Sequence, residues 1–183
     1  MKKIYRFIFF RLMGWRINGS MDPELKKYVI IVVPHTSWFD FFIGVLTRGA
    51  IGQQMHFVAK KELFRFPLGA YFRWMGGAPL DRQKNENKVD AIAAIFKERE
   101  VFRLAIAPEG TRKRVDHWKT GFYYIALKAD VPVVCVAFDY GRKEVKIAQP
   151  YYLTGDKEMD FEILETNYKG VEGYVREYSY IKD

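Results

Sequence analysis

The stretch YVIIVVPHTSWFD, residues 28–40, gives the clearest indication of the fold class. Residues 28–33 are apolar and mostly β-branched without alternation, which predicts a strand buried on both faces of a mainly parallel sheet. A turn containing Pro34 and His35 follows, and a helix is expected over 38–47. A strand, a turn and a helix in this order form the repeating unit of an α/β fold.

The same alternation continues along the chain. Further strands are expected at 55–59, 78–81, 102–107, 131–140 and 145–147, and further helices at 67–75, 87–99, 121–128 and about 158–174. This order predicts a single-domain α/β fold with a mixed, mainly parallel sheet flanked by helices. In such folds the chemistry usually lies at the carboxyl ends of the strands, so the residues just after each strand are the candidates for function.

The composition is that of a globular protein. Of the 183 residues, 49% are apolar and 28% are charged, so the chain can bury a core as one domain. The single cysteine, Cys135, lies in an apolar run and is expected to pack in the core of a protein from a reducing compartment. No Walker-type loop and no Cys/His metal spacing occurs, which argues against nucleotide hydrolysis and a metal site.

The charge balance indicates a polyanionic partner. There are 30 basic and 22 acidic residues, for a net charge of +8. Such a surface attracts nucleic acid, anionic lipid, a CoA-type molecule or an acidic carrier protein, or it serves only solubility. Nucleic acid is not expected, because no recognition-helix, zinc-finger or aromatic RNA-binding signature occurs.

The first segment, residues 1–17, is basic and amphipathic. It reads MKKIYRFIFFRLMGWRI and carries five positive charges and no acid, and its longest uncharged apolar run, 7–10, is too short to span a membrane. Projected at about 100° per residue, one face gathers Ile4, Ile8, Leu12 and Trp15. Two interpretations stay open: a helix lying on anionic lipid, or a helix docked on the protein's own domain, residues 18–183.

His35 and Asp40 form an H-x-x-x-x-D spacing directly after the first strand. Five residues apart on one helix they would point about 140° apart, so they can meet only if His35 lies in the turn and Asp40 in the first helical turn. The carboxylate would then orient the imidazole, whose other nitrogen could accept a proton from a hydroxyl. The alternative is a capping box, Ser37-x-x-Asp40, with no chemical role.

The segment Ala107-Pro108-Glu109-Gly110-Thr111-Arg112 also follows a strand. A tight turn through Gly110 and Thr111 offers backbone donors, and Arg112 a guanidinium, for a phosphate, while Glu109 could hold a hydroxyl. The alternative is an ordinary turn with a surface Glu/Arg pair.

Two further segments contain candidate anion-binding residues. Gly76-Gly77-Ala78-Pro79-Leu80-Asp81-Arg82 ends a strand with Arg82, which is suited to bidentate phosphate binding. Trp118-Lys119-Thr120-Gly121 opens a helix, where Thr120 could act as the N-cap and Lys119 could contact an anion. A plain helix cap is the alternative for the second segment.

In order and spacing, four blocks of the sequence resemble the glycerolipid acyltransferase family typified by lysophosphatidic acid acyltransferases. The blocks are His35 to Asp40, Gly76 to Arg82, Glu109 to Arg112 and the V-P-V block at 131–134. The resemblance implies an acyltransferase domain in which His35 is the general base and Asp40 orients it. It further implies that Arg82 and Arg112 bind the acceptor's phosphate and that Glu109 positions its glycerol part. Pro34 and Cys135 depart from the family pattern where the acceptor or acyl chain could be shaped.

The resemblance implies direct transfer of an acyl group from acyl-CoA or acyl carrier protein to the hydroxyl of a lysophospholipid, with lysophosphatidate as the expected acceptor and no bound cofactor. The aromatic stretches 38–42 and 64–74 are candidates for an acyl groove, although core packing is an alternative use of these rings. The expected location is the cytoplasmic side of an anionic membrane, as a peripheral protein. Two rivals are transfer to another lyso-lipid, such as one containing an amino acid, and a non-enzymatic binder of lipid or nucleic acid.

Overall fold

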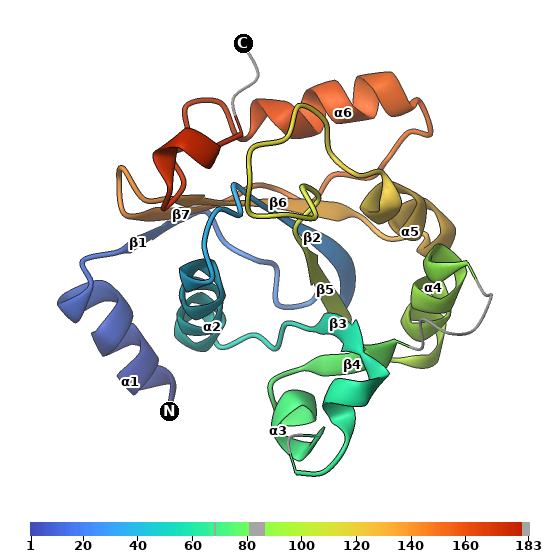
Figure 1. The fold of residues 1–183 in the computed structure, drawn as a ribbon, viewed down its shortest axis with the longest axis horizontal. Helices are drawn as coiled ribbons and strands as arrows, with labels where there is room; N and C mark the ends of the chain where they lie inside the picture. Colours follow the sequence, from blue (N-terminus) through green and yellow to red (C-terminus); the bar gives the residue numbers. More distant parts are fainter. Residues whose placement is uncertain (68, 81–86, 181–183) are drawn as a thin grey trace.

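The computed structural model describes residues 1–67, 69–80 and 87–180, and within these residues the main sheet has five strands in the order β1–β7–β6–β2–β5 (Figure 1). They are β1 (Arg16–Asn18), β2 (Lys27–Val33), β5 (Phe102–Ile106), β6 (Val133–Asp139) and β7 (Glu144–Ile147). Neighbouring strands are parallel except β6 and β7. The predicted mixed, mainly parallel sheet is therefore confirmed.

The central strand β2 is buried on both faces, which explains why its sequence shows no alternation. Val29 and Ile31 contribute to a core cluster shared with side chains of α4, α5 and α6. Ile30 contributes to a second cluster, which contains Ile43 and Phe9 from the helices on the other face. The sheet thus separates two apolar cores.

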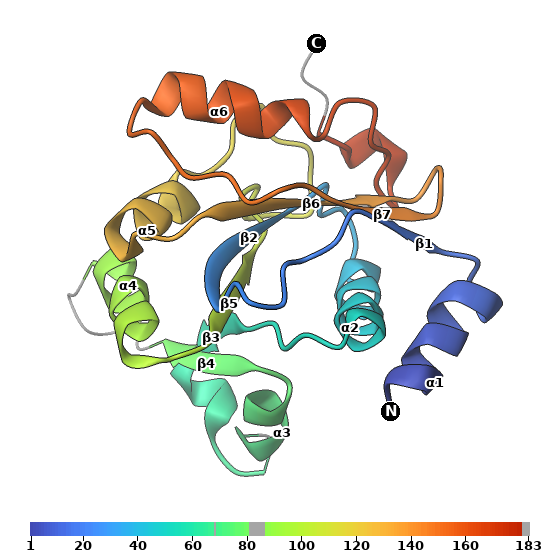
Figure 2. The ribbon, with the colours of Figure 1, turned by 180° about the vertical axis from the view of Figure 1, so that it is seen from behind.

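Helices cover both faces of the sheet (Figures 1 and 2). On one side lie α2 (Phe39–Ile51) and the N-terminal helical segment, α1 (Lys2–Arg6) with η1 (Phe7–Leu12). On the other side lie α5 (Gly121–Ala129) and α6 (Lys157–Thr166), with α4 (Lys88–Glu98) beside α5. None of the described helices is long and apolar enough to cross a membrane.

Two of the expected strands form a separate small sheet. β3 (Phe57–Lys60) and β4 (Gly77–Leu80) pair in parallel, and η2 (Lys61–Phe64) and α3 (Gly69–Trp74) connect them. A single parallel bridge between His56 and Leu104 joins this unit to β5 of the main sheet.

The structure shortens the expected C-terminal helix and adds a strand. The C-terminal helix ends at Thr166, not near residue 174, because the Asn167 side chain donates to the carbonyls of Ile163 and Leu164 and so terminates the helix. The short helix η3 (Arg176–Tyr178) follows. Strand β1 was not predicted, since three residues with one half-buried side chain give no recognisable pattern.

The N-terminal segment docks on the sheet, but of the four residues on the projected face only Trp15 is buried. Phe9 and Trp15 are buried in the second core cluster, whereas Ile4 and Leu12 are exposed. Residues 7–12 form a π-helix, in which Met13 N donates to Ile8 O, so the 100° projection fails beyond Phe7. The segment therefore has one buried apolar face and one exposed apolar face.

Candidate functional site

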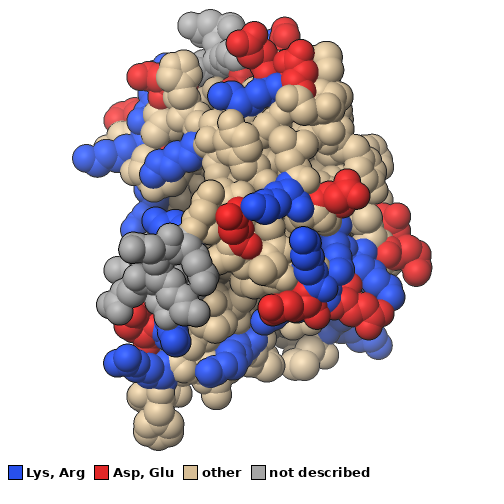
Figure 3. All heavy atoms as spheres, turned by 90° about the vertical axis from the view of Figure 1, so that its right-hand side faces the viewer, with Lys and Arg blue, Asp and Glu red and all other residues tan. Residues whose placement is uncertain are grey.

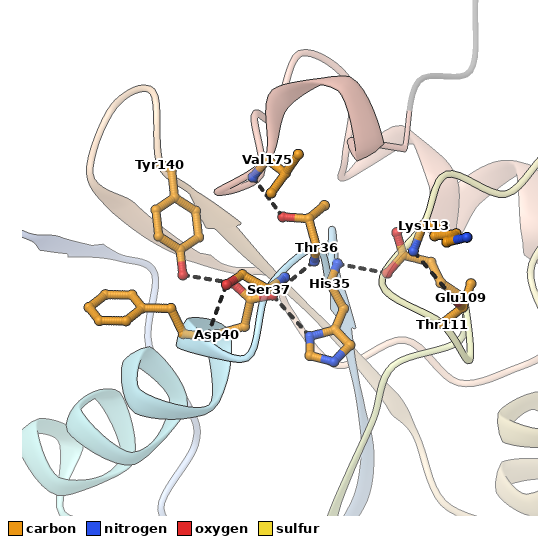
Figure 4. Close-up of polar contacts among 10 residues, drawn as sticks. His35, Thr36, Ser37, Asp40, Glu109, Thr111, Lys113, Tyr140 and Val175 are labelled. Atoms are coloured by element: carbon orange, nitrogen blue, oxygen red, sulfur yellow. Dashed lines mark hydrogen bonds and ion pairs between the residues drawn. The ribbon is translucent and has the colours of Figure 1, made fainter.

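The site lies where three neighbouring strands end. Strands β6, β2 and β5 are adjacent and parallel, so their carboxyl ends share one edge of the sheet. His35 follows β2, Glu109 follows β5 and Tyr140 follows β6 directly. Figure 4 shows these three residues grouped around the turn that leads into α2.

His35 and Asp40 meet as the spacing predicted. Nδ1 of His35 lies 2.9 Å from Oδ2 of Asp40, with the histidine in the turn and the aspartate in the first turn of α2. The Asp40 side chain is 2% exposed and the His35 side chain is 30% exposed. The carboxylate is thus shielded from water, while the imidazole can reach a bound molecule.

The capping box Ser37-x-x-Asp40 forms only in part, because Trp38 is the N-cap residue of α2 and makes no side-chain cap hydrogen bond. Oδ2 of Asp40 accepts hydrogen bonds from the backbone amides of Thr36 and Ser37, both at 2.9 Å, and the Ser37 hydroxyl accepts one from Phe39 N. The same carboxylate therefore organises the helix start and contacts the imidazole. Contact with the imidazole is thus compatible with a role of Asp40 at the helix start, and the catalytic role of the pair stays a prediction.

This arrangement leaves His35 able to act as a base. With Asp40 ionised, Nδ1 of the imidazole carries the proton and donates to Oδ2, and Nε2 keeps a free electron pair. A hydroxyl placed against Nε2 could then lose its proton as its oxygen attacks an electrophile. Cys135 lies in the core, as expected. Burial raises the pKa of its thiol to about 12 and keeps the thiol protonated, so it is not placed to act as a nucleophile.

Glu109 faces inward, toward the turn. It is 2% exposed, and its Oε2 accepts a 2.7 Å hydrogen bond from the backbone amide of His35. Burial raises the pKa of Glu109 to about 7, although the bond from His35 opposes this shift. The Glu109 carboxylate therefore ties the turn after β5 to the turn after β2.

The residues after Glu109 form an exposed basic loop. Gly110 has φ of +66°, and a Cβ at this position would lie 2.5 Å from Nζ of Lys119. A backbone hydrogen bond from Lys119 N to Pro108 O closes the loop. Thr111 and Arg112 are exposed. The structure thus brings Gly110 and Lys119 together beside Glu109 and leaves Arg112 open to solvent.

Arg82, the remaining predicted anion contact, lies outside the described residues. Strand β4, which precedes it in the chain, ends at Leu80. The role of Arg82 in binding the acceptor's phosphate stays a prediction.

Tyr140 was missed by the sequence analysis. Its hydroxyl donates a 2.7 Å hydrogen bond to Oδ1 of Asp40, so it contacts the oxygen that His35 does not use. The expected strand 131–140 included this residue, whereas β6 ends at Asp139. With the correct boundary, the rule of examining residues just after each strand would have found it.

The C-terminal segment also supports the turn. Oγ1 of Thr36 accepts a 3.0 Å hydrogen bond from the backbone amide of Val175 (Figure 4). The ring of Tyr174 packs on that of Phe39, with 5.7 Å between centroids. The turn is therefore held by the chain after β5, the chain after β6 and the C-terminal segment.

A mostly apolar cavity of about 390 Å³ begins at the site. His35 and Asp40 line it together with residues of α2, the main sheet and the β3–β4 unit: Phe41, Gly44, Ile30, Val136, Phe57 and Met75. Of the two aromatic stretches proposed for an acyl groove, 38–42 contributes to the lining, but no described residue of 64–74 does.

Three comparisons relate the chain to known proteins. The family profile described as Acyltransferase matches residues 16–139. The 1-acyl-sn-glycerol-3-phosphate acyltransferase of Bacillus subtilis is 31% identical over 128 residues, which cover 68% of this chain and 62% of that protein. The protein of the same name from Salmonella typhimurium is 28% identical over 137 residues, covering 69% of this chain and 54% of that protein. The chain thus spans less than two thirds of the length of these curated relatives.

The third comparison concerns the fold. The crystal structure of the 1-acyl-sn-glycerophosphate (LPA) acyltransferase PlsC from Thermotoga maritima matches with a TM-score of 0.62 at 22% identity, covering 90% of this chain and 74% of that one. The profile match includes His35, Asp40 and Glu109, three of the residues that the strand ends bring together. As the resemblance to glycerolipid acyltransferases predicted, the chain belongs to the acyltransferase family.

Proposed function

We propose that the protein transfers a fatty acyl group from an acyl thioester to the free hydroxyl of a lysophospholipid, with lysophosphatidate as the acceptor, in phospholipid biosynthesis. The observation that carries this proposal is the 2.9 Å contact between His35 and the buried Asp40 beside an apolar cavity. The activity named for the Bacillus and Salmonella relatives supports the choice of acceptor.

The reaction is a direct transfer. Nε2 of His35 takes the proton of the acceptor hydroxyl while its oxygen forms a bond to the thioester carbonyl carbon. The carbon–sulfur bond breaks, and the proton on His35 passes to the departing sulfur, so the products are an ester and a free thiol. Asp40 stays ionised throughout and stabilises the imidazolium that forms between the two proton transfers.

The acceptor's phosphate is bound by the basic loop after β5. Arg112 and Lys119 are exposed near Glu109, and Gly110 places Lys119 against the turn. Arg82 contributes a further guanidinium. Glu109 accepts the hydrogen bond of the His35 amide. It therefore positions the acceptor's glycerol part indirectly, by holding the turn that contains His35.

The acyl chain occupies the apolar cavity. Its volume of about 390 Å³ lies in the range of small-molecule sites, and its mostly apolar lining suits a hydrocarbon chain. With the chain in the cavity, the thioester carbonyl lies next to His35, which belongs to the same lining.

The enzyme works at the cytoplasmic surface of an anionic membrane. The helices α1, α2 and α3 lie on the same side of the main sheet, opposite α6 (Figures 1 and 2). Exposed apolar side chains gather on these helices and next to them: Ile4, Phe7, Leu12, Trp38, Phe41, Phe42, Phe66, Tyr71 and Trp74. Apolar side chains together with N-terminal lysines and arginines are the features of an interfacial segment.

A non-enzymatic binder of nucleic acid would need a continuous basic surface. On the face shown in Figure 3, acidic side chains lie among the lysines and arginines. This face is therefore not continuously basic. The non-enzymatic rival predicts binding to polyanions that collapses with rising salt and occurs without turnover.

The proposal is tested with purified wild type, His35→Ala and His117→Ala, the last changing a histidine that is exposed. Each protein receives lysophosphatidate in mixed micelles and either acyl-CoA or acyl carrier protein thioester, and the diacyl product is measured. We expect wild type and His117→Ala to form product, and His35→Ala to lose about 10² to 10⁴ of the rate while remaining folded, as for the loss of a general base.

Two results would contradict the proposal. If His35→Ala retains the wild-type rate, His35 is not the general base. If wild type is inactive with both donors and several lyso-lipids, the chain shares the fold of its relatives but not the proposed activity.

A further inference from the structure

The two carboxylate oxygens of Asp40 have separate partners. Oδ2 accepts hydrogen bonds from Nδ1 of His35 and from the amides of Thr36 and Ser37. Oδ1 accepts the hydroxyl of Tyr140 at 2.7 Å (Figure 4). Because the Asp40 side chain is 2% exposed, water cannot readily replace this hydroxyl.

The Tyr140 ring is fixed from two directions. Trp15 of the N-terminal segment packs edge-on against it, with 4.9 Å between centroids and 89° between planes. Tyr174 of the C-terminal segment packs on it at 5.4 Å and 80°. The backbone amide of Tyr140 donates to Glu172 O, which ties the same position to the C-terminal segment. The hydroxyl is therefore held in place by contacts that do not involve Asp40.

An aspartate carboxylate has a soft terminal torsion, so one oxygen anchored on three donors can still leave the carboxylate plane free to turn. A second anchor on the other oxygen removes that freedom. Here the second anchor is a neutral phenol, since burial, together with the hydrogen bond to Asp40, raises the pKa of Tyr140 and keeps its proton in place for donation.

We propose that Tyr140 is a positioning residue of the acyl-transfer site, which fixes the Asp40 carboxylate so that Oδ2 meets Nδ1 of His35 in the orientation that the base requires. This inference rests on the proposed function. Tyr140 acts through Asp40 and does not touch the reacting atoms. It links the catalytic pair to the N-terminal segment, because Trp15 holds its ring.

The first test is kinetic. Tyr140→Phe keeps the ring contacts and removes one hydrogen bond to a charged group, so we expect kcat to fall about 10- to 100-fold with KM nearly unchanged. In an Asp40→Ala background the same substitution should have little further effect, because Tyr140 acts only through that carboxylate. An equal loss in both backgrounds would overturn the proposal.

The matched control is Tyr151→Phe. The Tyr151 hydroxyl donates at 2.8 Å to Oδ1 of Asp160, a fully buried carboxylate that also accepts the Tyr123 hydroxyl. This substitution removes a comparable tyrosine–carboxylate bond away from the site. We expect it to leave kcat at the wild-type value, so a loss of kcat in both variants would show a general effect on folding and contradict a specific role for Tyr140.

The second test needs no substrate. The proton shared by Nδ1 of His35 and Asp40 should give a downfield proton NMR signal, assigned by its absence in His35→Ala. We expect Tyr140→Phe to shift or broaden this signal and Tyr151→Phe to leave it unchanged. An unaltered signal in Tyr140→Phe overturns the positioning role. Because this readout does not depend on turnover, it decides the role of Tyr140 even if the wild type forms no diacyl product.

Discussion

At Asp40, Oδ2 accepts two backbone amides and one imidazole nitrogen. The spacing Ser37-x-x-Asp40 places the carboxylate over the turn that precedes α2, and His35 belongs to that turn. The fold of the turn therefore sets the position of the imidazole. This explains why capping and catalytic interpretations of the sequence pointed to the same residue.

Glu109 gives the site a pH-dependent stability. Its pKa is about 7 in the folded protein against an ordinary value of 4.5, because the carboxyl group is buried. Between these values the folded protein binds more protons at Glu109 than the unfolded chain does, so this contribution to the free energy of unfolding is present below pH 4.5 and is lost as pH rises to 7. The size of the contribution is on the order of 3 kcal/mol.

The variant Glu109→Gln isolates this effect, since an amide keeps a hydrogen-bond acceptor for the His35 amide but does not titrate. We expect the free energy of unfolding of wild type, measured relative to Glu109→Gln by urea denaturation, to fall as pH rises from 4.5 to 7. A difference between the two proteins that stays constant across this range would show that Glu109 is not the titrating group.

At the scale of elements, the N-terminal segment has two apolar faces, one buried in the core and one exposed. Phe9 is fully buried and packs near Trp15 in the core beneath the sheet, whereas the Leu12 side chain is 68% exposed. One face thus belongs to the folded core, and the other is available to a lipid surface.

Substitutions on the two faces are expected to affect different properties, the free energy of unfolding and the binding to vesicles. Phe9→Ala should lower the free energy of unfolding by about 3–5 kcal/mol through the cavity that it leaves. Leu12→Asn should leave stability nearly unchanged and weaken sedimentation with anionic phospholipid vesicles. Chemical denaturation and vesicle co-sedimentation of both variants check this. Unchanged vesicle binding in Leu12→Asn would argue against the exposed face as the lipid contact.

The elements that the sequence predicted well are those whose burial fixes their composition. Strands β2, β5 and β6 are mostly apolar because helices cover both faces of the sheet, and this leaves a recognisable run of residues. Strand β1 and the π-helix at 7–12 depend on contacts with distant parts of the chain, so local composition could not reveal them. The end of α6 was recognisable in principle from Asn167.

At the scale of the whole molecule, parallel pairing assembles the site. Strands β6, β2 and β5 lie side by side, so residues more than 70 positions apart meet at one edge: Glu109 contacts His35 and Tyr140 contacts Asp40. The rule that chemistry follows strand ends marked His35 and Glu109 as candidates, but it predicted no contact between them. The inward direction of Glu109 and the part played by Tyr140 depend on side-chain packing, which no motif spacing encodes.

In the proposed mechanism the acceptor hydroxyl attacks the thioester directly, with His35 as the base. Direct attack is tested by rapid-mixing measurement of free-thiol release from acyl-CoA, or from acyl carrier protein thioester, with and without lysophosphatidate. We expect no burst of thiol without the acceptor, and one diacyl product for each thiol released when the acceptor is present. A burst approaching one thiol per enzyme molecule in the absence of acceptor would reveal an acyl-enzyme and contradict direct transfer.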